Sequence, residues 1–299
     1  MRNFLDNILT ILKVFYLSTF RGISWVTKFS LKNKLLILGN GPSIKESLDS
    51  IIESKEEFEV LAVNKFAISD EFHLIKPRFY FLLDGDFFQF DESIFNDAAK
   101  HPRVKKKPEF QAVQDEINKT WFSLLNCSWD LTLFVPQIYQ DSFLINKARD
   151  AGLNVRVYNY TVLKGSDSLV NFLFQRGLGL PQCQNVINAA IGIGLLLKPE
   201  QIWLTGLDHS FHLGLEVDEH NQVWEKVTHF YSSKGEYFKH PLVNQKTGAR
   251  VTLKEVFSNL WKVHESYDKL RMLSDRSQIN IYNATQGGFV DAFERRPIK

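Results

Sequence analysis

The sequence predicts an α/β protein with a mostly parallel sheet flanked by helices. Short apolar runs alternate along the chain with segments of helical periodicity, which is typical of a parallel sheet whose strands are connected by helices. The chain has 299 residues, of which 44% are hydrophobic and 23% are charged. This balance is that of a folded globular protein, and the length accommodates one large domain with an appendage.

The apolar runs and the helical segments follow one another in order along the chain. The expected strands are Leu35–Leu38, Glu59–Val63, Phe79–Leu83, Leu131–Val135, Asn154–Tyr158, Gln201–Thr205 and Asn280–Tyr282. The expected helices are Ile44–Glu53, Phe110–Leu125, Ser142–Ala151, Ser168–Gly177, Asn185–Leu197 and Leu253–Ser274.

The segment 1–33 precedes the first strand and is both apolar and basic. Its apolar residues recur at helical spacing, which predicts an amphipathic helix with Leu5, Leu9, Leu12, Tyr16 and Phe20 on one side. Lys13 and Arg21 interrupt the apolar run before about 18 residues accumulate, so a transmembrane span is not predicted. Such a basic amphipathic helix can lie on an anionic membrane surface. Packing on the main domain and oligomerisation are the alternatives.

Composition excludes several classes of protein. Cys127 and Cys183 are the two cysteines, too few for a disulfide framework or a paired-cysteine metal cluster, so we expect a reducing compartment. The formal net charge of +2 does not indicate a nucleic-acid partner.

The stretch KLLILGNGPSIKE, residues 34–46, is the first candidate site. Gly39 and Gly41 let a backbone turn tightly and approach a ligand closely. Ser43 stands where a helix should begin, and Glu46 follows at the spacing of a capping box. Free N–H groups at a helix start bind anions. The turn therefore suits a nucleotide phosphate or ribose, and an ordinary strand-to-helix turn is the alternative.

Polar residues also close the second and third expected strands. Asn64 follows the second strand, where its amide could form hydrogen bonds with a base or a sugar hydroxyl. An Asx turn is the alternative. Asp84 and Asp86 follow the third strand and could bind a divalent metal, bind substrate hydroxyls or cap a turn.

The segment 206–250 holds five of the eight histidines, which are His209, His212, His220, His229 and His240. It begins with Gly206, Asp208 and His209, directly after an apolar strand, and then shows few strand or helix signals. Long irregular segments in compact domains are usually functional or disordered. Its aromatic and histidine content argues against disorder, so we expect a lid or insertion over about 207–250. A histidine there suits general-base work.

The motifs LILGNGPSIKE, VNKF and IGIGLLLKPEQIWLTGLDHSF together resemble the bacterial sialyltransferases of the Campylobacter type. They also resemble the wider group that includes the flagellin nonulosonate transferases (motility-associated factors) and the archaeal hydroxymethylpterin diphosphokinase. The closing INIYNATQGGFVDAF resembles the end of that group's domain. The resemblance covers roughly residues 34–290, with Gly-Asn-Gly-Pro-Ser as its most specific motif.

The resemblance implies a Rossmann-like catalytic domain of the GT-A-variant type over 34–299 that binds a nucleotide sugar. It implies inverting transfer of a sialic acid, another nonulosonate or Kdo from a CMP-activated donor to a glycan or lipid-linked acceptor, with no metal or cofactor required. Bacterial surface polysaccharide assembly, of lipopolysaccharide or capsule, is the expected context. The enzyme would be cytoplasmic and peripheral on the inner membrane. A homo-oligomer is compatible with the resemblance.

The resemblance also implies roles for particular residues. The family's catalytic base is a histidine of the lid, for which His229 is the best match and His209 the second. Tyr231 and Lys234 are candidates to offset charge on the departing phosphate. The implied nucleotide-binding residues are Gly39, Asn40, Gly41, Ser43, Asn64, Asp84, Asn185, Gly206 and Asp208.

Two other functions remain open on the sequence. The first is a diphosphokinase of the hydroxymethylpterin type, which would use ATP and Mg²⁺ with Asp84, Asp86 or Asp208 as metal ligands, because phosphoryl transfer depends on metal and positioning. The second is a non-catalytic module that binds a nucleotide or a glycan.

Overall fold

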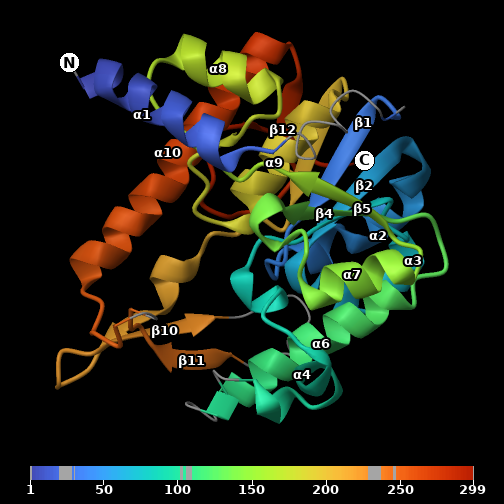
Figure 1. Cartoon of the computed structure of the whole chain (residues 1–299), viewed down its shortest axis with the longest axis vertical. Coiled ribbons are helices and arrows are strands. Elements are labelled where there is room, and N and C mark those ends of the chain that lie inside the picture. Colours follow the sequence, from blue (N-terminus) through green and yellow to red (C-terminus); the bar gives the residue numbers. More distant parts are fainter. Residues whose placement is uncertain are drawn as a thin grey trace.

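The computed structural model describes residues 2–19, 29, 31–101, 104–105, 110–227, 237–244 and 247–298. Its centre is an eight-stranded sheet with the strand order β13-β12-β8-β1-β2-β3-β4-β5 (Figure 1). Every neighbouring pair in this sheet is parallel. The predicted α/β class with a Rossmann-like parallel sheet is therefore confirmed.

The strands of this sheet lie where the apolar runs predicted them, with a short β13 added at the edge. They are β1 (Lys34–Leu38), β2 (Phe58–Val63), β3 (Phe79–Phe81), β4 (Thr132–Pro136), β5 (Asn154–Tyr158), β8 (Gln201–Thr205), β12 (Asn280–Asn283) and β13 (Glu294–Arg295). A separate two-stranded sheet pairs β6 (Val162–Leu163) with β7 (Leu180–Pro181).

The predicted helices are present as well, and short helices fill the connections. The α-helices are α1 (Arg2–Leu17), α2 (Ile44–Ser54), α3 (Glu71–Ile75), α4 (Glu92–Asn96), α6 (Gln111–Leu125), α7 (Phe143–Asp150), α8 (Asp167–Gln175), α9 (Val186–Leu197) and α10 (Leu253–Ser277).

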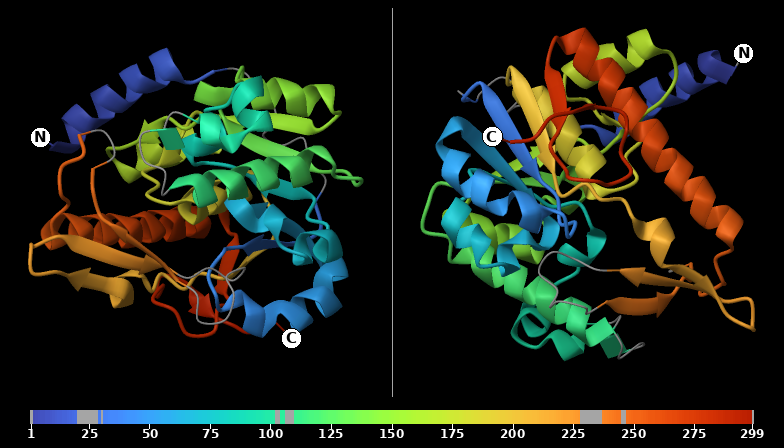
Figure 2. Two further views of the ribbon diagram at one scale, coloured as in Figure 1. Left: turned by 90° about the horizontal axis from the view of Figure 1, so that it is seen from below. Right: turned by 180° about the vertical axis from the view of Figure 1, so that it is seen from behind.

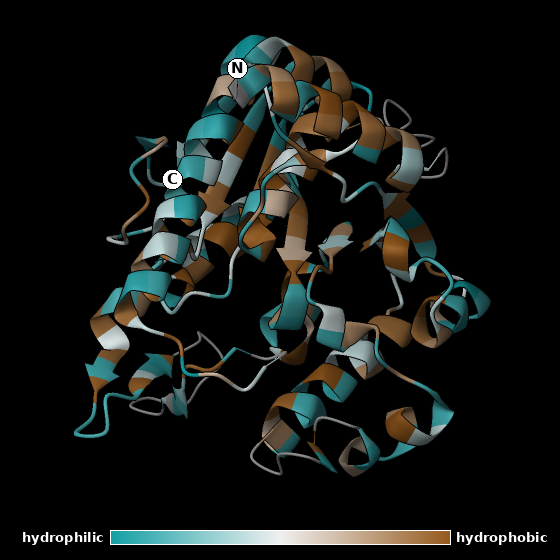
Figure 3. Ribbon diagram, turned by 60° about the vertical axis from the view of Figure 1, so that its left-hand side comes forward, coloured by the Kyte–Doolittle hydropathy of each residue, from teal (hydrophilic) through white to brown (hydrophobic). Residues whose placement is uncertain are grey.

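Each face of the sheet has its own helices and its own core. Leu35 and Ile37 of β1 belong to the core that contains α8, α9 and α10. Leu36 and Leu38, which point the other way, belong to the core that contains α2, α3, α6 and α7. All four side chains are fully buried, as expected for a parallel sheet that is covered on both faces. The central strands accordingly appear mostly brown in Figure 3.

Helix α9 is apolar on all sides except at Asn188, and every residue from Ile187 to Leu197 is buried. A helix of this composition is stable only when it is surrounded by protein. It packs against both the sheet and α10, so its position and direction are fixed by its neighbours.

The expectation that residues 207–250 are irregular is wrong. This segment contains η8 (Phe211–Gly214) and a three-stranded antiparallel sheet of β9 (Leu215–Val217), β10 (Val223–Val227) and β11 (Phe238–Pro241). These strands lie apart from the main sheet (Figure 1). Most side chains of β9 and β10 are partly or fully exposed, so no apolar periodicity marks them in the sequence.

Helix α1 confirms the predicted amphipathic helix as far as Leu17, and Phe20 lies outside the described residues. It lies at the periphery of the molecule (Figure 2). Among the described residues, no helix has the length and hydropathy needed to cross a membrane. Cys127 and Cys183 are free thiols.

Candidate functional site

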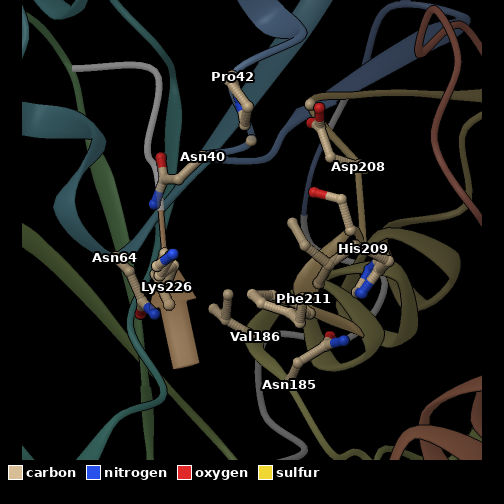
Figure 4. Close-up of a pocket in the computed structure, with 14 residues that line it drawn as sticks. Asn40, Pro42, Asn64, Asn185, Val186, Asp208, His209, Phe211 and Lys226 are labelled. Carbon is tan, nitrogen blue, oxygen red and sulfur yellow. The ribbon is translucent and has the colours of Figure 1, made fainter. Parts of the chain in front are cut away.

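A cavity of ≈ 200 Å³ opens at the carboxyl edge of the main sheet. From β1 the chain continues to β2, which lies on one side of β1 in the sheet. On the other side of β1 lies β8, and from β8 the chain continues outward to β12. This reversal is a topological switch point, the place where open α/β sheets bind ligands. The cavity is lined by Asn40, Gly41, Pro42, Asn64, Asn185, Val186, Ile187, Gly206, Asp208, His209, Ser210, Phe211, Lys226 and Val227 (Figure 4).

The turns that follow β1 and β8 pack directly on each other. The N–H of Gly39 donates to the carbonyl of Thr205 at 2.8 Å, and the N–H of Gly41 donates to the carbonyl of Gly206 at 3.1 Å. A Cβ on Gly39 would overlap the Gly206 carbonyl, and one on Gly41 would overlap the Asp208 carboxylate. The glycines of this turn are therefore required by the contact between two strand ends.

Ser43 and Asp208 join the same two turns. Asp208 Oδ1 accepts from the Ser43 N–H at 3.1 Å, and Oδ2 accepts from the Ser43 hydroxyl at 2.7 Å. The expected capping of α2 by the Ser43 side chain is wrong, because that hydroxyl is committed to Asp208. The Asp208 carboxylate thus occupies the start of α2, where we expected a ligand anion. Desolvation raises the pKa of Asp208, and the Ser43 hydrogen bonds partly offset that rise.

Two amide oxygens at this edge have no hydrogen-bond partner among the residues that the structure describes. Asn40 Nδ2 donates to the carbonyl of Val63 at 3.2 Å, but Asn40 Oδ1 and Asn64 Oδ1 are buried and unpaired. Asn64 closes β2 with a left-handed backbone, at φ 45°. Leaving a buried acceptor unpaired costs about 1–3 kcal/mol. Both residues line the cavity, so a ligand donor that reached these enclosed oxygens would relieve this cost.

The amino-terminal end of α9 forms another part of the wall. Asn185 caps this helix, because its Oδ1 accepts from the Asn188 N–H at 2.8 Å. Val186 and Ile187, the first residues of the helix, line the cavity. The N–H groups of a first helical turn have no partner within the helix, and the helix dipole is positive there. This end is suited to an anion.

His209 is held against α10 by a residue that the sequence did not single out. Its Nε2 lies 2.6 Å from the Tyr267 hydroxyl, and its Nδ1 is buried with no partner in the described part of the chain. Burial, with a smaller contribution from His264, lowers the pKa of His209 to about 4. The imidazole is therefore neutral at pH 7. Tyr267 lies on α10, some 60 residues away in the chain, and no local signal marks it.

Residues of the segment 207–250 complete the wall of the cavity. Lys226 and Val227 come from β10, and Phe211 comes from η8. Figure 4 shows Lys226 beside Asn64 and Phe211 on the opposite side of the cavity. The Lys226 ammonium pairs with Glu216, which also pairs with Lys239 at 2.8 Å. Lys226 and Phe211 were missed, because the segment that carries them shows no strand or helix pattern.

The structure brings most of the predicted nucleotide-binding residues together. Those that line the cavity are Asn40, Gly41, Asn64, Asn185, Gly206, Asp208 and the predicted catalytic residue His209. Gly39 and Ser43 adjoin this wall through the contacts above. Asp84 is exposed at the end of β3, accepts from the Asp86 N–H at 3.2 Å and does not line the cavity. His229, Tyr231 and Lys234 lie outside the described residues, so their roles stay predictions.

Asp84 and Asp86 were also considered as metal ligands, and Asp208 under the diphosphokinase alternative. Within the described ranges, no group of three or more His, Cys, Asp or Glu side chains is placed to hold a metal ion.

The chain is similar in structure to the MAf glycosyltransferase from Magnetospirillum magneticum AMB-1. The identity is 14%, the TM-score is 0.44 and the alignment covers 98% of this chain. The chain spans 38% of the length of that protein. No protein-family model matches the sequence, and no curated protein matches it.

Proposed function

We propose that the chain is a glycosyltransferase that takes a CMP-activated sugar as its donor. The observation that carries the proposal is the cavity at the switch point between β1 and β8. Its wall combines buried amide acceptors, the amino-terminal end of a buried helix that Asn185 caps, and a lysine that pairs with Glu216. This combination fits a nucleoside with one or two phosphates.

Each part of the wall has a proposed role. The Asn40 and Asn64 oxygens accept hydrogen bonds from the amine of the base or from ribose hydroxyls. The first turn of α9 faces the phosphate, and the Lys226 ammonium exchanges its Glu216 partner for it. At ≈ 200 Å³ the cavity is smaller than the usual ligand pocket of about 300–1,000 Å³. It therefore holds the nucleotide part of the donor, and the sugar extends toward β10.

The proposed reaction is an inverting transfer of a sialic acid, another nonulosonate or Kdo. A base removes the proton of the acceptor hydroxyl as its oxygen bonds to the anomeric carbon, and CMP departs with the electron pair of the broken bond. We assign the base to His229, which follows the cavity-lining Val227 by two positions in the chain. Tyr231, Lys234 and lid N–H groups offset charge on the departing phosphate. The lowered pKa of His209 makes it a weak base, so we assign it a binding role.

The proposed acceptor is a glycan or a lipid-linked sugar at the inner leaflet of the membrane, in surface polysaccharide assembly. The outward face of α1 supports this location. Phe4, Leu5, Phe15 and Tyr16 are each more than half exposed, an arrangement typical of helices that lie in a membrane interface.

Nucleotide binding is the experiment that tests the donor. The melting temperature of the full chain would be measured with CMP, CDP, UDP, GDP and ATP, each with and without Mg²⁺. We expect cytidine nucleotides to stabilise the protein without Mg²⁺, because bound ligand shifts the folding equilibrium. A response to ATP that needs Mg²⁺ would support the diphosphokinase instead. No response to any nucleotide would contradict both.

Transfer of labelled sugar from CMP-activated donors tests the base. His229→Ala should lower the turnover about 10²–10⁴-fold, the usual cost of losing a general base. His220→Ala is the matched control, since His220 is largely exposed on the inserted segment and does not line the cavity. Equal turnover of the two variants would remove His229 from this role.

A further inference from the structure

Two lysines lie directly opposite each other in the three-stranded sheet of β9, β10 and β11. The register pairs Lys226 of β10 with Lys239 of β11. Like charges in directly opposed positions destabilise an antiparallel pair of strands. This arrangement is therefore stable only when a negative charge lies close to both ammonium groups.

Glu216 of β9 supplies that negative charge. It lies opposite Trp224, which shares a face of the sheet with Lys226 two positions further on. Glu216 Oε1 accepts from the Lys226 ammonium, and Oε2 accepts from the Lys239 ammonium at 2.8 Å. The hydrogen bond from Lys226, and then that from Lys239, lower the pKa of Glu216 to about 2. The carboxylate is therefore charged at neutral pH.

These three side chains differ in their relation to the cavity at the carboxyl edge of the main sheet. Lys226 lines it, whereas Glu216 and Lys239 are not part of its wall. Figure 4 shows Lys226 in that wall, beside Asn64. Glu216 thus holds, from outside the cavity, the ammonium that the phosphate of a ligand would bind.

The second lysine allows Glu216 to release Lys226 without becoming a bare carboxylate. When Lys226 turns to a phosphate, Glu216 keeps its ion pair with Lys239. The three side chains are 33–43% exposed, and ion pairs in contact with water are weak. The exchange of partners therefore costs one weak ion pair, which a phosphate can replace.

We propose that Glu216 competes with the nucleotide phosphate for Lys226 and so limits how tightly the cavity holds the nucleotide. The proposal rests on the CMP-activated donor proposed above. In that reaction the phosphate changes from a diester with one negative charge to the monoester of CMP, and a phosphate monoester carries about 1.5–2 negative charges at pH 7. The added charge strengthens the attraction of CMP to Lys226. Competition by Glu216 counteracts this attraction and promotes release of the product, a step that limits the rate of many enzymes.

Calorimetric titration of the full chain with CMP and with cytidine, which lacks the phosphate, tests the proposal. The salt concentration is about 0.15 M, at which exposed charges are screened beyond about 8 Å. The test variant is Glu216→Gln. The matched control is Glu219→Gln, which removes the same charge from the same segment, because the Glu219 side chain is 85% exposed and does not line the cavity.

Glu216→Gln should bind CMP about two- to fivefold more tightly than the wild type, which is the contribution of an exposed ion pair. Its affinity for cytidine should equal that of the wild type, because a neutral nucleoside does not draw Lys226 away from its partner. This equality also shows that the variant is folded. Glu219→Gln should bind both ligands as the wild type does.

Lys239→Gln separates competition from a general effect of charge. Without Lys239, the Glu216 carboxylate holds Lys226 more firmly, so the affinity for CMP should fall about two- to fivefold. In Glu216→Gln/Lys239→Gln the competitor is absent, and the affinity should equal that of Glu216→Gln. A general effect of net charge would instead return this double variant to the wild-type affinity, because the two changes of charge cancel.

Four results would overturn the proposal. Equal CMP affinity of the wild type and Glu216→Gln would exclude competition while leaving the proposed donor intact. An equal gain in Glu219→Gln, or wild-type affinity in the double variant, would assign the effect to net charge. A gain for cytidine as large as that for CMP would show a change in the cavity that does not involve the phosphate. Absence of CMP binding to the wild type would contradict the donor and the competition together.

Discussion

His209 lies in an environment unlike that of an ordinary surface histidine. It adopts a left-handed backbone at φ 46°, its Nε2 meets Tyr267, and its Nδ1 is buried without a partner. These features together hold a neutral imidazole in the wall of the cavity, where it can exchange a hydrogen bond with a ligand but carries no charge near pH 7.

His209 should make the stability of the protein depend on pH in one direction. Its pKa is about 4 in the folded state and about 6.5 in the unfolded state. The unfolded chain therefore binds the extra proton between these values, and stability falls as the pH falls through that window. Between pH 7.5 and 5, this site should remove about 2 kcal/mol from the free energy of unfolding.

Urea unfolding at the two pH values measures this effect. Asparagine tolerates the left-handed backbone. On acidification, the free energy of unfolding of His209→Asn should therefore fall by about 2 kcal/mol less than that of the wild type. His220→Asn is the control, because His220 is largely exposed. An identical pH dependence in the wild type and His209→Asn would contradict the lowered pKa.

At the scale of elements, the start of α9 combines a structural role with a proposed ligand-binding role. Asn185 stabilises the helix by accepting from the Asn188 N–H, and the same residue lines the cavity. Helix α10 has a comparable start far from the cavity wall, where Thr252 and Glu255 form a capping box. The two caps can therefore be compared directly.

Substitution of these caps separates the two roles. Asn185→Ala and Thr252→Ala should each cost about 1 kcal/mol, the usual value for a lost amino-terminal cap. Asn185→Asp keeps an acceptor for the cap but places a negative charge beside the proposed phosphate, so its stability should hold while CMP binding weakens. Thermal unfolding and calorimetric titration with CMP measure both effects. Unchanged CMP affinity in Asn185→Asp would place the phosphate away from α9.

At the scale of the whole molecule, α1 determines which side of the protein is apolar. The helix adds little to the core, since only Val14 of its residues packs against one of the two core clusters. Its apolar residues lie on the outside, where exposed hydrophobic surface lowers solubility unless a partner or a membrane covers it.

Replacing Phe4 and Phe15 with Gln should weaken binding to neutral vesicles by at least about 100-fold, because burial of each ring in the membrane contributes about 1.5–3 kcal/mol. Phe122→Gln/Ile138→Gln is the matched control, because these side chains are 65% and 64% exposed elsewhere on the surface. Vesicle sedimentation and light scattering would report binding and aggregation. If the two double variants bind neutral vesicles equally well, the exposed apolar side of α1 is not the docking surface.

The secondary structure was largely predictable from the sequence, because the patterns that specify it are local. The runs at Leu35–Leu38 and Gln201–Thr205 are apolar without interruption, as buried parallel strands are. The polar residues that follow them were rightly expected at one edge of the sheet, since parallel strands end on the same side. The strands β9 to β11 were missed because exposed strands carry no apolar pattern.

The sequence by itself thus determined the class of fold, most of its elements and part of the group of residues at the carboxyl edge. Only the tertiary structure decided which residues pair there. Ser43 binds an aspartate rather than its own helix, His209 meets Tyr267, and α1 turns its polar side inward toward the loop at Gly165. The physical reason is that periodicity depends on neighbouring residues, whereas these partners are far apart in the chain and meet only after the sheet and its helices have packed.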